Sequence, residues 1–398
     1  MARRRRLAVL TTMSVWPPRR GGQNRVAGLL SNLGEGWEVC HFAQSIQRTD
    51  LPVPRRRVTV TPAWTEWRLM DPVSWAWMFL AGRLGYPPVG ADALLRLAPR
   101  RAVRRAIQAA DAVLVFHPWQ VAWARRLTPR NVPLVLDASD VATVLYAAGA
   151  SPLRQRVHRR LTRDEDRAWH LADVVVLASE ADRAVVAQAG ISETAVLPNG
   201  VDTRGITPAS AETRAAALAR LGVAPGGCVA LFIGSRHPPN LEAVAALEAQ
   251  APAFAAAGIT LVLVGRSSLG RDARPGIIHA GEVPDVRPYL DAADLGLCPL
   301  AHGTGTSDKV LTYLAAGLPT LATPVGARGF EGEDAGIEVC AAEAMPARAA
   351  ALFADPAAMT RMGASARRVA ADTYDWRQLG ARLGGILDRA ISTCSPRL

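Results

Sequence analysis

Short apolar segments of strand length alternate with helical segments along the whole chain, and this alternation limits the possible folds more than any other feature. Within the strand segments the apolar residues run almost without interruption, which is typical of strands buried on both faces of a parallel sheet. We therefore predict an α/β fold with two Rossmann-like, doubly wound domains. The expected strands are residues 7–12, 38–42, 58–61, 112–116, 134–137, 174–178, 195–197, 229–233, 260–264, 277–279, 295–298, 320–322 and 337–339.

Most segments between these strands have the apolar spacing of helices. A length of 398 residues suits two domains of ordinary size. The composition changes around residues 202–225, where proline, glycine and an alanine-rich helix intervene, so we expect the boundary there. In such folds ligands bind beyond the carboxyl ends of the strands, here in a central cleft between the two sheets. The other expected helices are residues 24–33, 98–109, 153–170, 181–189, 240–257, 286–292, 307–316, 342–354 and 357–371.

Composition argues against a membrane-spanning or secreted protein. No apolar run approaches the roughly 18 residues that cross a bilayer, and the arginine-rich amino terminus lacks the pattern of a signal peptide. The five cysteines are scattered without a paired spacing, which argues against a disulfide framework and against a zinc site. We expect a cytoplasmic protein.

Positive charge is concentrated in the first half of the chain. Residues 1–200 carry 28 arginines against 16 acidic residues, whereas residues 201–398 are close to neutral. This asymmetry is typical of a face that meets an anionic ligand or surface. A nucleic acid is one candidate, but the basic residues lack the interleaved aromatic residues of a single-strand groove, so we expect no nucleic-acid partner.

Tryptophans are concentrated between Trp64 and Gly82, and the expected structure there is a loop and a helix packed on the first domain. The alternative is an apolar acceptor platform or an interfacial membrane contact, because tryptophan suits surfaces with one wet side. Arginines at residues 100–105 and 154–163 would suit an anionic bilayer surface. Peripheral attachment at the inner face of the membrane is therefore a second hypothesis for location.

Lys309 is the only lysine in a chain with 46 basic residues. Where either cation would serve, this sequence has arginine, so a lysine indicates a position that needs a compact point charge. The lysine follows an expected strand and the loop residues Gly303, Thr304, Gly305 and Thr306, and it lies in the first turn of an expected helix. Backbone N–H groups of this loop, the helix dipole and the ammonium would converge on one anion, so we predict a pyrophosphate site. Gly21 and Gly22 open an earlier helix and give a weaker signal of the same kind.

Eight short motifs follow one another along the chain in a specific order. They are Gly21-Gly22, Leu197-Pro-Asn-Gly-Val-Asp202, Phe232-Ile-Gly-Ser-Arg-His-Pro-Pro-Asn240, Leu261-Val-Leu-Val-Gly265, Gly281-Glu-Val-Pro-Asp285, Pro299-Leu300 with the Lys309 loop, Gly326-Ala-Arg-Gly329 and Tyr374-Asp-Trp376. In this order the chain resembles the GT-B glycosyltransferases, and within them the large retaining family four that uses nucleotide sugars. The resemblance covers nearly the whole length.

The resemblance implies that the two domains bind different substrates. Residues 1–203, completed by a carboxy-terminal helix at 376–398, would bind the acceptor, and residues 204–375 would bind the nucleotide sugar. Gly234, Arg236 and Lys309 would hold the donor diphosphate. The remaining donor-binding positions that it implies are Gly21, Gly22, Asn240, Gly265, Gly281, Glu282, Val283, Gly303, Thr304, Gly305, Thr306 and Thr312.

Two further residues would serve the acceptor side. His117, at the end of an expected strand, resembles the histidine that contacts the sugar or the acceptor, and the alternative is a structural histidine before Pro118. Asp140 matches a polar position near the acceptor, and a loop cap is the alternative. Both are counted with Arg236 and Lys309 as candidate catalytic residues.

The chain departs from the family at the ribose site. Many members carry two glutamates separated by seven residues, and the second binds the ribose hydroxyls. Thr304 and Thr312 stand at the matching positions, and a threonine cannot accept two hydrogen bonds from a diol as a carboxylate does. The departure raises the alternative of a non-catalytic GT-B subunit, and Asp308 or Glu282 could compensate for it.

The resemblance implies that a sugar moves from a nucleotide diphosphate to an acceptor hydroxyl with its anomeric configuration kept. No cofactor is expected, and the cations would replace a metal ion. The acceptor could be a small molecule, a glycan or a lipid-linked sugar, in bacterial glycoconjugate or natural product biosynthesis. Alternatives are a sugar-nucleotide epimerase, a phosphorylase, a non-catalytic scaffold and, on charge alone, a nucleic-acid binder. A phosphorylase would need a second lysine for pyridoxal phosphate.

Overall fold

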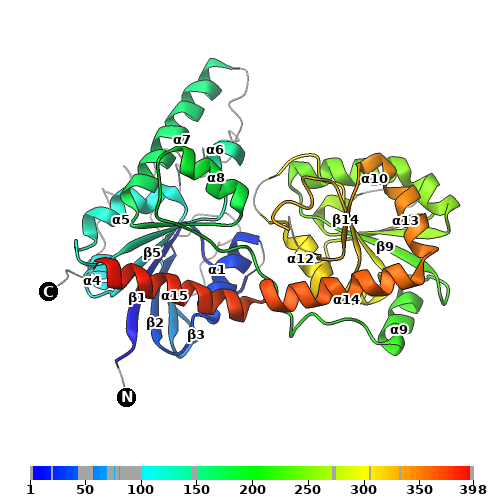
Figure 1. Ribbon diagram of the computed structural model, residues 1–398, viewed down its shortest axis with the longest axis horizontal. Coiled ribbons are helices and arrows are strands. Elements are labelled where there is room, and N and C mark those ends of the chain that lie inside the picture. The colour runs from blue at the N-terminus through cyan, green and yellow to red at the C-terminus, as the bar shows by residue number, and fades with distance from the viewer. Residues whose placement is uncertain are drawn as a thin grey trace. The chain divides into compact units, whose positions relative to one another are not determined.

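The chain divides into two compact units. The structure, a computed structural model, describes residues 3–18, 21–43, 57–69, 76, 80, 101–145, 151–270, 275–303, 306–330 and 334–394. Unit 1 comprises Met1–Asn199 with Arg377–Leu398, and unit 2 comprises Gly200–Trp376. Each unit has a sheet covered by helices (Figure 1). Residues 377–394, which belong to the last described helix, are part of the same unit as the first strand.

Unit 1 is built on an eight-stranded sheet with the order β3-β4-β2-β1-β5-β6-β7-β8 among the described residues. Neighbouring strands pair in parallel except β3 and β4, which are antiparallel. The central strand β5 is apolar throughout and β6 is apolar except for Asp137, as expected for strands with both faces covered. The strands are β1 (Arg5–Thr11), β2 (Trp37–Ala43), β3 (Arg57–Thr61), β4 (Trp64–Arg68), β5 (Ala112–Phe116), β6 (Leu134–Ala138), β7 (Val174–Leu177) and β8 (Thr194–Val196).

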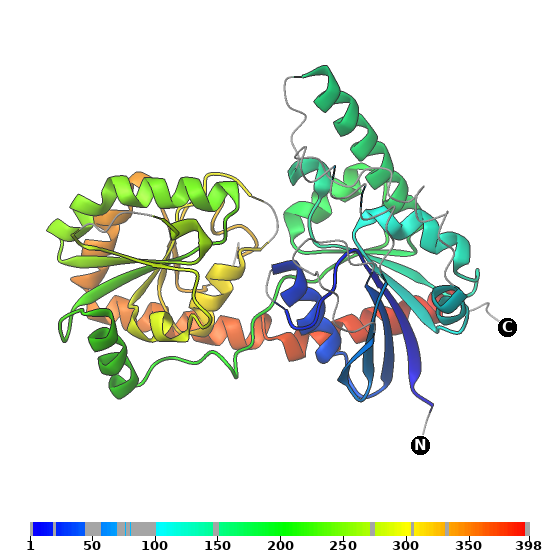
Figure 2. The ribbon, with the colours of Figure 1, turned by 180° about the vertical axis from the view of Figure 1, so that it is seen from behind.

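Helices lie on both faces of this sheet. The helices α4, α5, α7 and α8 contribute to one core with alternate residues of β1, β5, β6 and β7, while α1 and α15 lie on the other face (Figures 1 and 2). The helices are α1 (Gly21–Ser31), α4 (Arg101–Gln108), η2 (Pro118–Gln120), α5 (Val121–Leu127), α6 (Ala142–Leu145), α7 (Pro152–Leu171), α8 (Glu180–Gln188) and α15 (Trp376–Cys394).

The prediction of a loop and helix from Trp64 onward is wrong for Trp64–Arg68, which forms β4. In this strand Trp64 and Glu66 point to the buried side, because alternate residues of a strand face the same way. Trp64 is 1% exposed, so it cannot serve as an acceptor platform or a membrane contact. Trp75 and Trp77 lie outside the described residues.

Unit 2 is built on a six-stranded parallel sheet with the order β11-β10-β9-β12-β13-β14. Ala230 and Phe232 of β9 face a core shared with α10 and α13. Val229 and Leu231 face the opposite core, shared with α9 and α11. The strands are β9 (Cys228–Ile233), β10 (Ile259–Val264), β11 (Ile277–Gly281), β12 (Leu295–Cys298), β13 (Thr320–Ala322) and β14 (Ile337–Val339).

The helices of unit 2 follow the sequence prediction closely, although residues 342–354 begin as a 3₁₀ turn rather than as α-helix. They are α9 (Ala211–Leu221), α10 (Pro238–Ala256), η3 (Arg266–Ser268), α11 (Arg287–Ala292), α12 (Asp308–Ala315), η4 (Ala342–Ala344), α13 (Met345–Phe353) and α14 (Pro356–Thr373). Each strand expected between residues 229 and 339 is confirmed, and so is the fold class of two Rossmann-like domains. Within the described segments, no helix has the length and apolar character needed to cross a bilayer.

Candidate functional site

Lys309 lies at the carboxyl edge of the unit 2 sheet, in the first turn of α12. Its Nζ donates a hydrogen bond to Oδ1 of Asn240 at 2.9 Å, and it lies 5.1 Å from the centre of the Phe232 ring. Nδ2 of Asn240 in turn donates to Oγ of Ser235 in the loop after β9. The ammonium is therefore held by groups from β9, its following loop and α10, and it does not extend freely into solvent.

Burial lowers the pKa of Lys309, while the neighbouring Cys298 and Asp308 oppose this shift. The ammonium has lost part of its hydration, and among the described residues no carboxylate is in hydrogen-bond contact with it. A cation in this situation is stabilised further by a bound anion. The geometry thus fits the pyrophosphate site that the sequence predicts.

The first turns of α12 are fixed to the sheet by Tyr313. Its buried hydroxyl accepts a hydrogen bond from the backbone N–H of Ile233 at 2.9 Å. The ring occupies space that a side chain at Gly296 of β12 would need, since a Cβ there would lie 2.4 Å from the ring. Lys309 lies one helical turn before Tyr313, so the same anchor sets the position of the lysine.

Gly234 and Gly265 let two loops approach at the same edge. Gly265 has φ +103°, and a Cβ there would lie 2.2 Å from the carbonyl oxygen of Gly234. That carbonyl accepts hydrogen bonds from the backbone N–H and from Oγ of Ser267. The loops after β9 and β10 are therefore joined by backbone contacts that leave no room for side chains at these glycines.

The other donor-site candidates of unit 2 surround this edge. Arg236 is exposed, in the loop between β9 and α10. Gly281 ends β11 and its carbonyl accepts from the N–H of Gly265, while the exposed Glu282 pairs with Arg266 at 3.2 Å. Val283 is half-buried. Of the loop before α12, Gly303 is exposed and Thr306 is buried, and Thr304 and Gly305 lie outside the described residues.

Thr312 is not oriented as a free hydroxyl donor. Its Oγ1 donates to the backbone carbonyl of Asp308 at 2.9 Å, one turn earlier in α12. The hydroxyl proton is therefore already used, and the oxygen can only accept a hydrogen bond from a ligand. Thr312 therefore has no hydroxyl proton left to donate to a ribose.

In unit 1, His117 follows β5 with φ +78° and ψ 145°, and it is the only described non-glycine residue with positive φ. This conformation costs of order 1–3 kcal/mol and is most frequent at functional sites. The backbone N–H donates to the carbonyl of Asp137, and the buried Nδ1 has no hydrogen-bond partner among the described residues. Burial lowers the pKa of His117 although Asp140 and Asp137 oppose the shift, so the imidazole is neutral at neutral pH. Asp140 itself is exposed.

A buried ion pair that the sequence did not predict lies next to His117. Nε and Nη2 of Arg25, on α1, lie 3.0 Å from the carboxylate of Asp137 at the end of β6. Arg25 also donates to Oδ1 of Asn199 and to the carbonyl of Leu197. Asp137 is a charged residue within the apolar strand segment 134–137, and this was the available signal of a buried ion pair. Its partner Arg25 could not be identified from the sequence, because it is 112 positions away.

A second missed cluster holds the loop that leads from β1 toward Gly21 and Gly22. The buried Glu66 accepts from the backbone N–H groups of Val15 and Trp16 and from Nε of Arg68. Gly22 lies in the first turn of α1, where a Cβ would lie 3.1 Å from Cε of Met13. The loop conformation thus depends on β4, which the sequence prediction did not include.

His41 completes this cluster. The hydroxyl of Thr11 donates to the carbonyl of Met13, so Nε2 of His41, 2.8 Å away, is the donor to Thr11. Nδ1 lies 3.5 Å from Glu66, which favours a charged ring, but Glu66 is already compensated by Arg68. Burial dominates and lowers the pKa of His41 to about 3. His41 is therefore neutral and structural.

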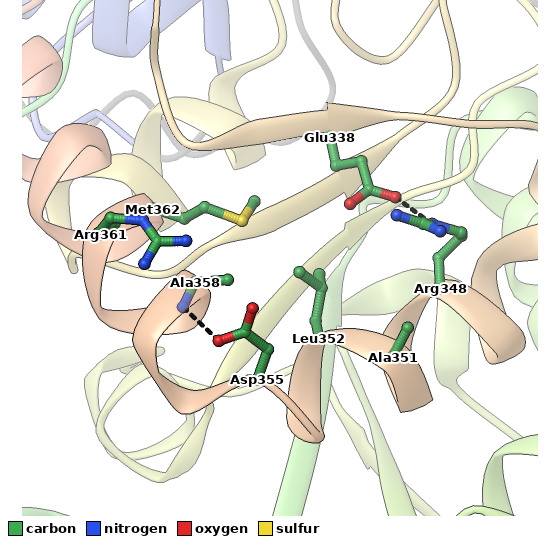
Figure 3. Close-up of a pocket in the computed structure, with 8 residues that line it drawn as sticks. All are labelled: Glu338, Arg348, Ala351, Leu352, Asp355, Ala358, Arg361 and Met362. Atoms are coloured by element: carbon green, nitrogen blue, oxygen red, sulfur yellow. Dashed lines mark hydrogen bonds and ion pairs between the residues drawn. The ribbon is translucent and has the colours of Figure 1, made fainter.

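A hollow of about 420 Å³ lies between β14, α13 and α14 (Figure 3). Three of its four charged side chains are engaged within the protein, since Arg348 pairs with Glu338 and Asp355 caps α14 by accepting from the N–H of Ala358. It shares no residue with the Lys309 site. Among the residues that the structure describes, no cluster of three or more histidine, cysteine or acidic side chains could hold a metal ion.

Comparison with known proteins agrees with this architecture. Residues 227–355 match the family described as Glycosyl transferases group 1, and no curated protein has a matching sequence. The chain is similar to the solved sucrose-phosphate synthase of Thermosynechococcus elongatus, with 18% identity, a TM-score of 0.75, and coverage of 98% of this chain and 100% of that one.

Two further solved structures are similar over almost their full length. HepE of Anabaena in complex with UDP has 17% identity and a TM-score of 0.64, with 97% of this chain and 100% of that chain covered. WaaG, a glycosyltransferase involved in lipopolysaccharide biosynthesis, has 18% identity and a TM-score of 0.62, with 96% and 99% covered. At such low sequence identity the structural similarity shows the fold alone, which is the GT-B fold of two Rossmann-like domains, and the Glycosyl transferases group 1 match lies in unit 2.

Proposed function

We propose that the protein is a retaining glycosyltransferase of family four that moves a sugar from a nucleotide-diphosphate sugar to an acceptor hydroxyl without a metal ion. The observation that carries the proposal is the half-buried Lys309 ammonium at the carboxyl edge of unit 2, inside the region that matches the Glycosyl transferases group 1 family. UDP and UDP-glucose in the structures of the similar HepE support a nucleotide-sugar donor.

The reaction requires the protein to stabilise a leaving group whose negative charge grows. As the bond between the anomeric carbon and the phosphate oxygen breaks, the Lys309 ammonium and the exposed Arg236 would neutralise the departing diphosphate. The acceptor oxygen attacks from the same face, forms the new bond to the anomeric carbon, and gives its proton to the leaving phosphate oxygen. Configuration is kept, and no enzyme nucleophile is required.

Unit 1 supplies the acceptor side in this proposal. His117 has the features of a positioned ligand-binding group, because its backbone is strained and its ring is neutral with a buried, unpartnered Nδ1 among the described residues. Asp140 is exposed near the same strand end and would contact acceptor hydroxyls. The acceptor class remains a small molecule, a glycan or a lipid-linked sugar.

One observation favours a second function, that of a non-catalytic GT-B subunit. Thr312 stands where a carboxylate would bind the ribose diol, and its hydroxyl proton is donated to the backbone of Asp308. A protein without turnover could still bind the diphosphate at Lys309. Binding and chemistry must therefore be measured separately.

Release of nucleoside diphosphate from a panel of nucleotide sugars tests the proposal. We expect slow donor hydrolysis by the unaltered protein, its loss in Lys309→Ala, and partial retention in Lys309→Arg, which keeps the charge. Arg361→Ala, which removes an exposed cation from the hollow between β14, α13 and α14, is the matched control. Nucleotide binding without release of product for any donor, in the presence of mixed acceptors, would favour the non-catalytic subunit.

A further inference from the structure

The amino-terminal half of α7 projects beyond the rest of unit 1 (Figures 1 and 2). The helix is anchored from its tenth residue onward, since Leu161, Ala168 and Trp169 are buried against unit 1. Residues 151–160 are exposed or half-buried. Core packing therefore explains the second half of this 20-residue helix, and it does not explain the first.

The projecting half carries a strong positive charge. Residues 152–163 contain five arginines and no acidic residue. Arg156, Arg159, Arg163 and Arg167 follow one another at helical spacing on the side opposite the buried residues. Arg160 pairs with Asp164, but within the described part of the chain no ion pair is found for those four arginines. Four solvent-facing guanidinium groups thus form one stripe, with three of them in residues 152–163 and Arg167 in the anchored part of the helix.

An exposed apolar side chain lies at the start of the same projection. Leu153, in the first turn of α7, is 61% exposed. An exposed large aliphatic side chain beside a basic stripe favours a surface with both anionic groups and an apolar layer. Nucleic acid offers the charge but gives no place for the aliphatic side chain.

We propose that the α7 projection, defined by residues 152–163, binds the anionic surface of a lipid membrane. The arginine stripe would lie on the headgroups, and Leu153 would enter the boundary with the acyl chains. Twelve helical residues span roughly 18 Å, which is long enough for several headgroups. The proposal does not depend on the glycosyltransferase reaction, because it uses neither Lys309 nor His117.

Sedimentation with lipid vesicles tests the projection. We expect the full chain to bind vesicles of phosphatidylcholine with phosphatidylglycerol and to leave pure phosphatidylcholine vesicles unbound. Each basic residue near an anionic surface contributes about a fivefold change in partition. The variant Arg156→Gln/Arg159→Gln/Arg163→Gln should therefore lose on the order of a hundredfold in partition, and Leu153→Ser should lose a smaller factor.

A matched control separates the projection from net charge. The variant Arg101→Gln/Arg104→Gln/Arg105→Gln removes three exposed arginines from α4 and should keep most of the vesicle binding. Circular dichroism compares the secondary structure of all variants, and thermal shift compares their stabilisation by a nucleoside diphosphate. Both should be the same as in the unaltered protein. Equal loss in both triple variants, no binding to anionic vesicles, or tighter binding to a DNA duplex than to the vesicles would overturn the proposal.

Discussion

At the scale of single residues, the contact between Lys309 and Asn240 joins side chains 69 positions apart. Asn240 orients the ammonium and also holds Ser235 in the neighbouring loop. We predict that Asn240→Ala weakens nucleoside diphosphate binding about tenfold, because the ammonium loses the hydrogen bond that fixes it. Asn240→Asp should weaken binding further, since a carboxylate would compete with the diphosphate. Calorimetric titration measures both, with Glu212→Gln at an exposed position of α9 as the control, and equal affinity in Asn240→Ala would contradict the assigned role.

The charge of Lys309 gives the binding reaction a defined pH dependence. Burial lowers the pKa of Lys309 below its ordinary value of 10.5, so the ammonium loses its proton at lower pH than an exposed lysine would. Diphosphate affinity should therefore decrease as pH rises through this lowered pKa, and binding near it should take up a proton. Calorimetry in buffers of different ionisation enthalpy detects that uptake, and it should be absent in Lys309→Ala. The same proton uptake in the alanine variant would contradict the account.

His41 predicts a pH dependence of stability. Its pKa is about 3 in the folded protein and 6.5 in an ordinary environment, so the unfolded chain binds a proton that the folded chain excludes. The free energy of unfolding should therefore be unaffected by this group above about pH 6.5. It should decrease as pH falls from there toward 3, by up to about 1.4 kcal/mol per pH unit. Urea unfolding of the unaltered protein and of His41→Gln measures the difference in slope, and identical slopes would rule out this role for His41.

At the scale of elements, α1 and β6 are joined by the buried pair of Arg25 and Asp137. Arg25→Met leaves the Asp137 carboxylate buried without its cation, which should lower the free energy of unfolding by about 3–5 kcal/mol. The double variant Arg25→Met/Asp137→Leu should recover much of that loss, because no unpaired charge remains. Urea unfolding provides the measurement. A double variant as unstable as Arg25→Met alone would show that packing rather than charge is responsible.

The accuracy of the sequence prediction also differs between elements. The strands of unit 2 were predictable because they are almost uniformly apolar and are bounded by glycine or by polar loops. β4 was missed because its inward-facing residues include Glu66, whose charge is compensated by Arg68 and by two backbone N–H groups. Such compensation depends on the tertiary structure, so the local sequence pattern does not contain it.

The candidate site shows the same limit. The importance of Lys309 was predictable, because it is the only lysine and it follows a glycine-rich loop. Its hydrogen bond to Asn240 was not predictable, since the two residues belong to different motifs. The strained backbone of His117 was also not predictable, because positive φ at a non-glycine residue arises from the surroundings. The Arg25–Asp137 pair required knowledge of which strand end lies next to α1.

At the scale of the whole molecule, two units of similar architecture carry different chemistry. Unit 2 has the glycine-rich edge and the lysine, and unit 1 has the strained histidine and most of the positive charge. The account therefore predicts that nucleotides stabilise the protein through unit 2. A thermal-shift panel of nucleoside diphosphates should rank the bases, since a ligand that binds the folded state raises stability by mass action.

The most direct test compares the affinity of the best nucleoside diphosphate with that of its monophosphate by calorimetry. We predict that the unaltered protein prefers the diphosphate, and that Lys309→Ala lowers this preference by about ten- to a hundredfold while Arg361→Ala keeps it. A preference that is the same in the unaltered protein and in Lys309→Ala, with both folded, would contradict the assignment of this edge as the diphosphate site.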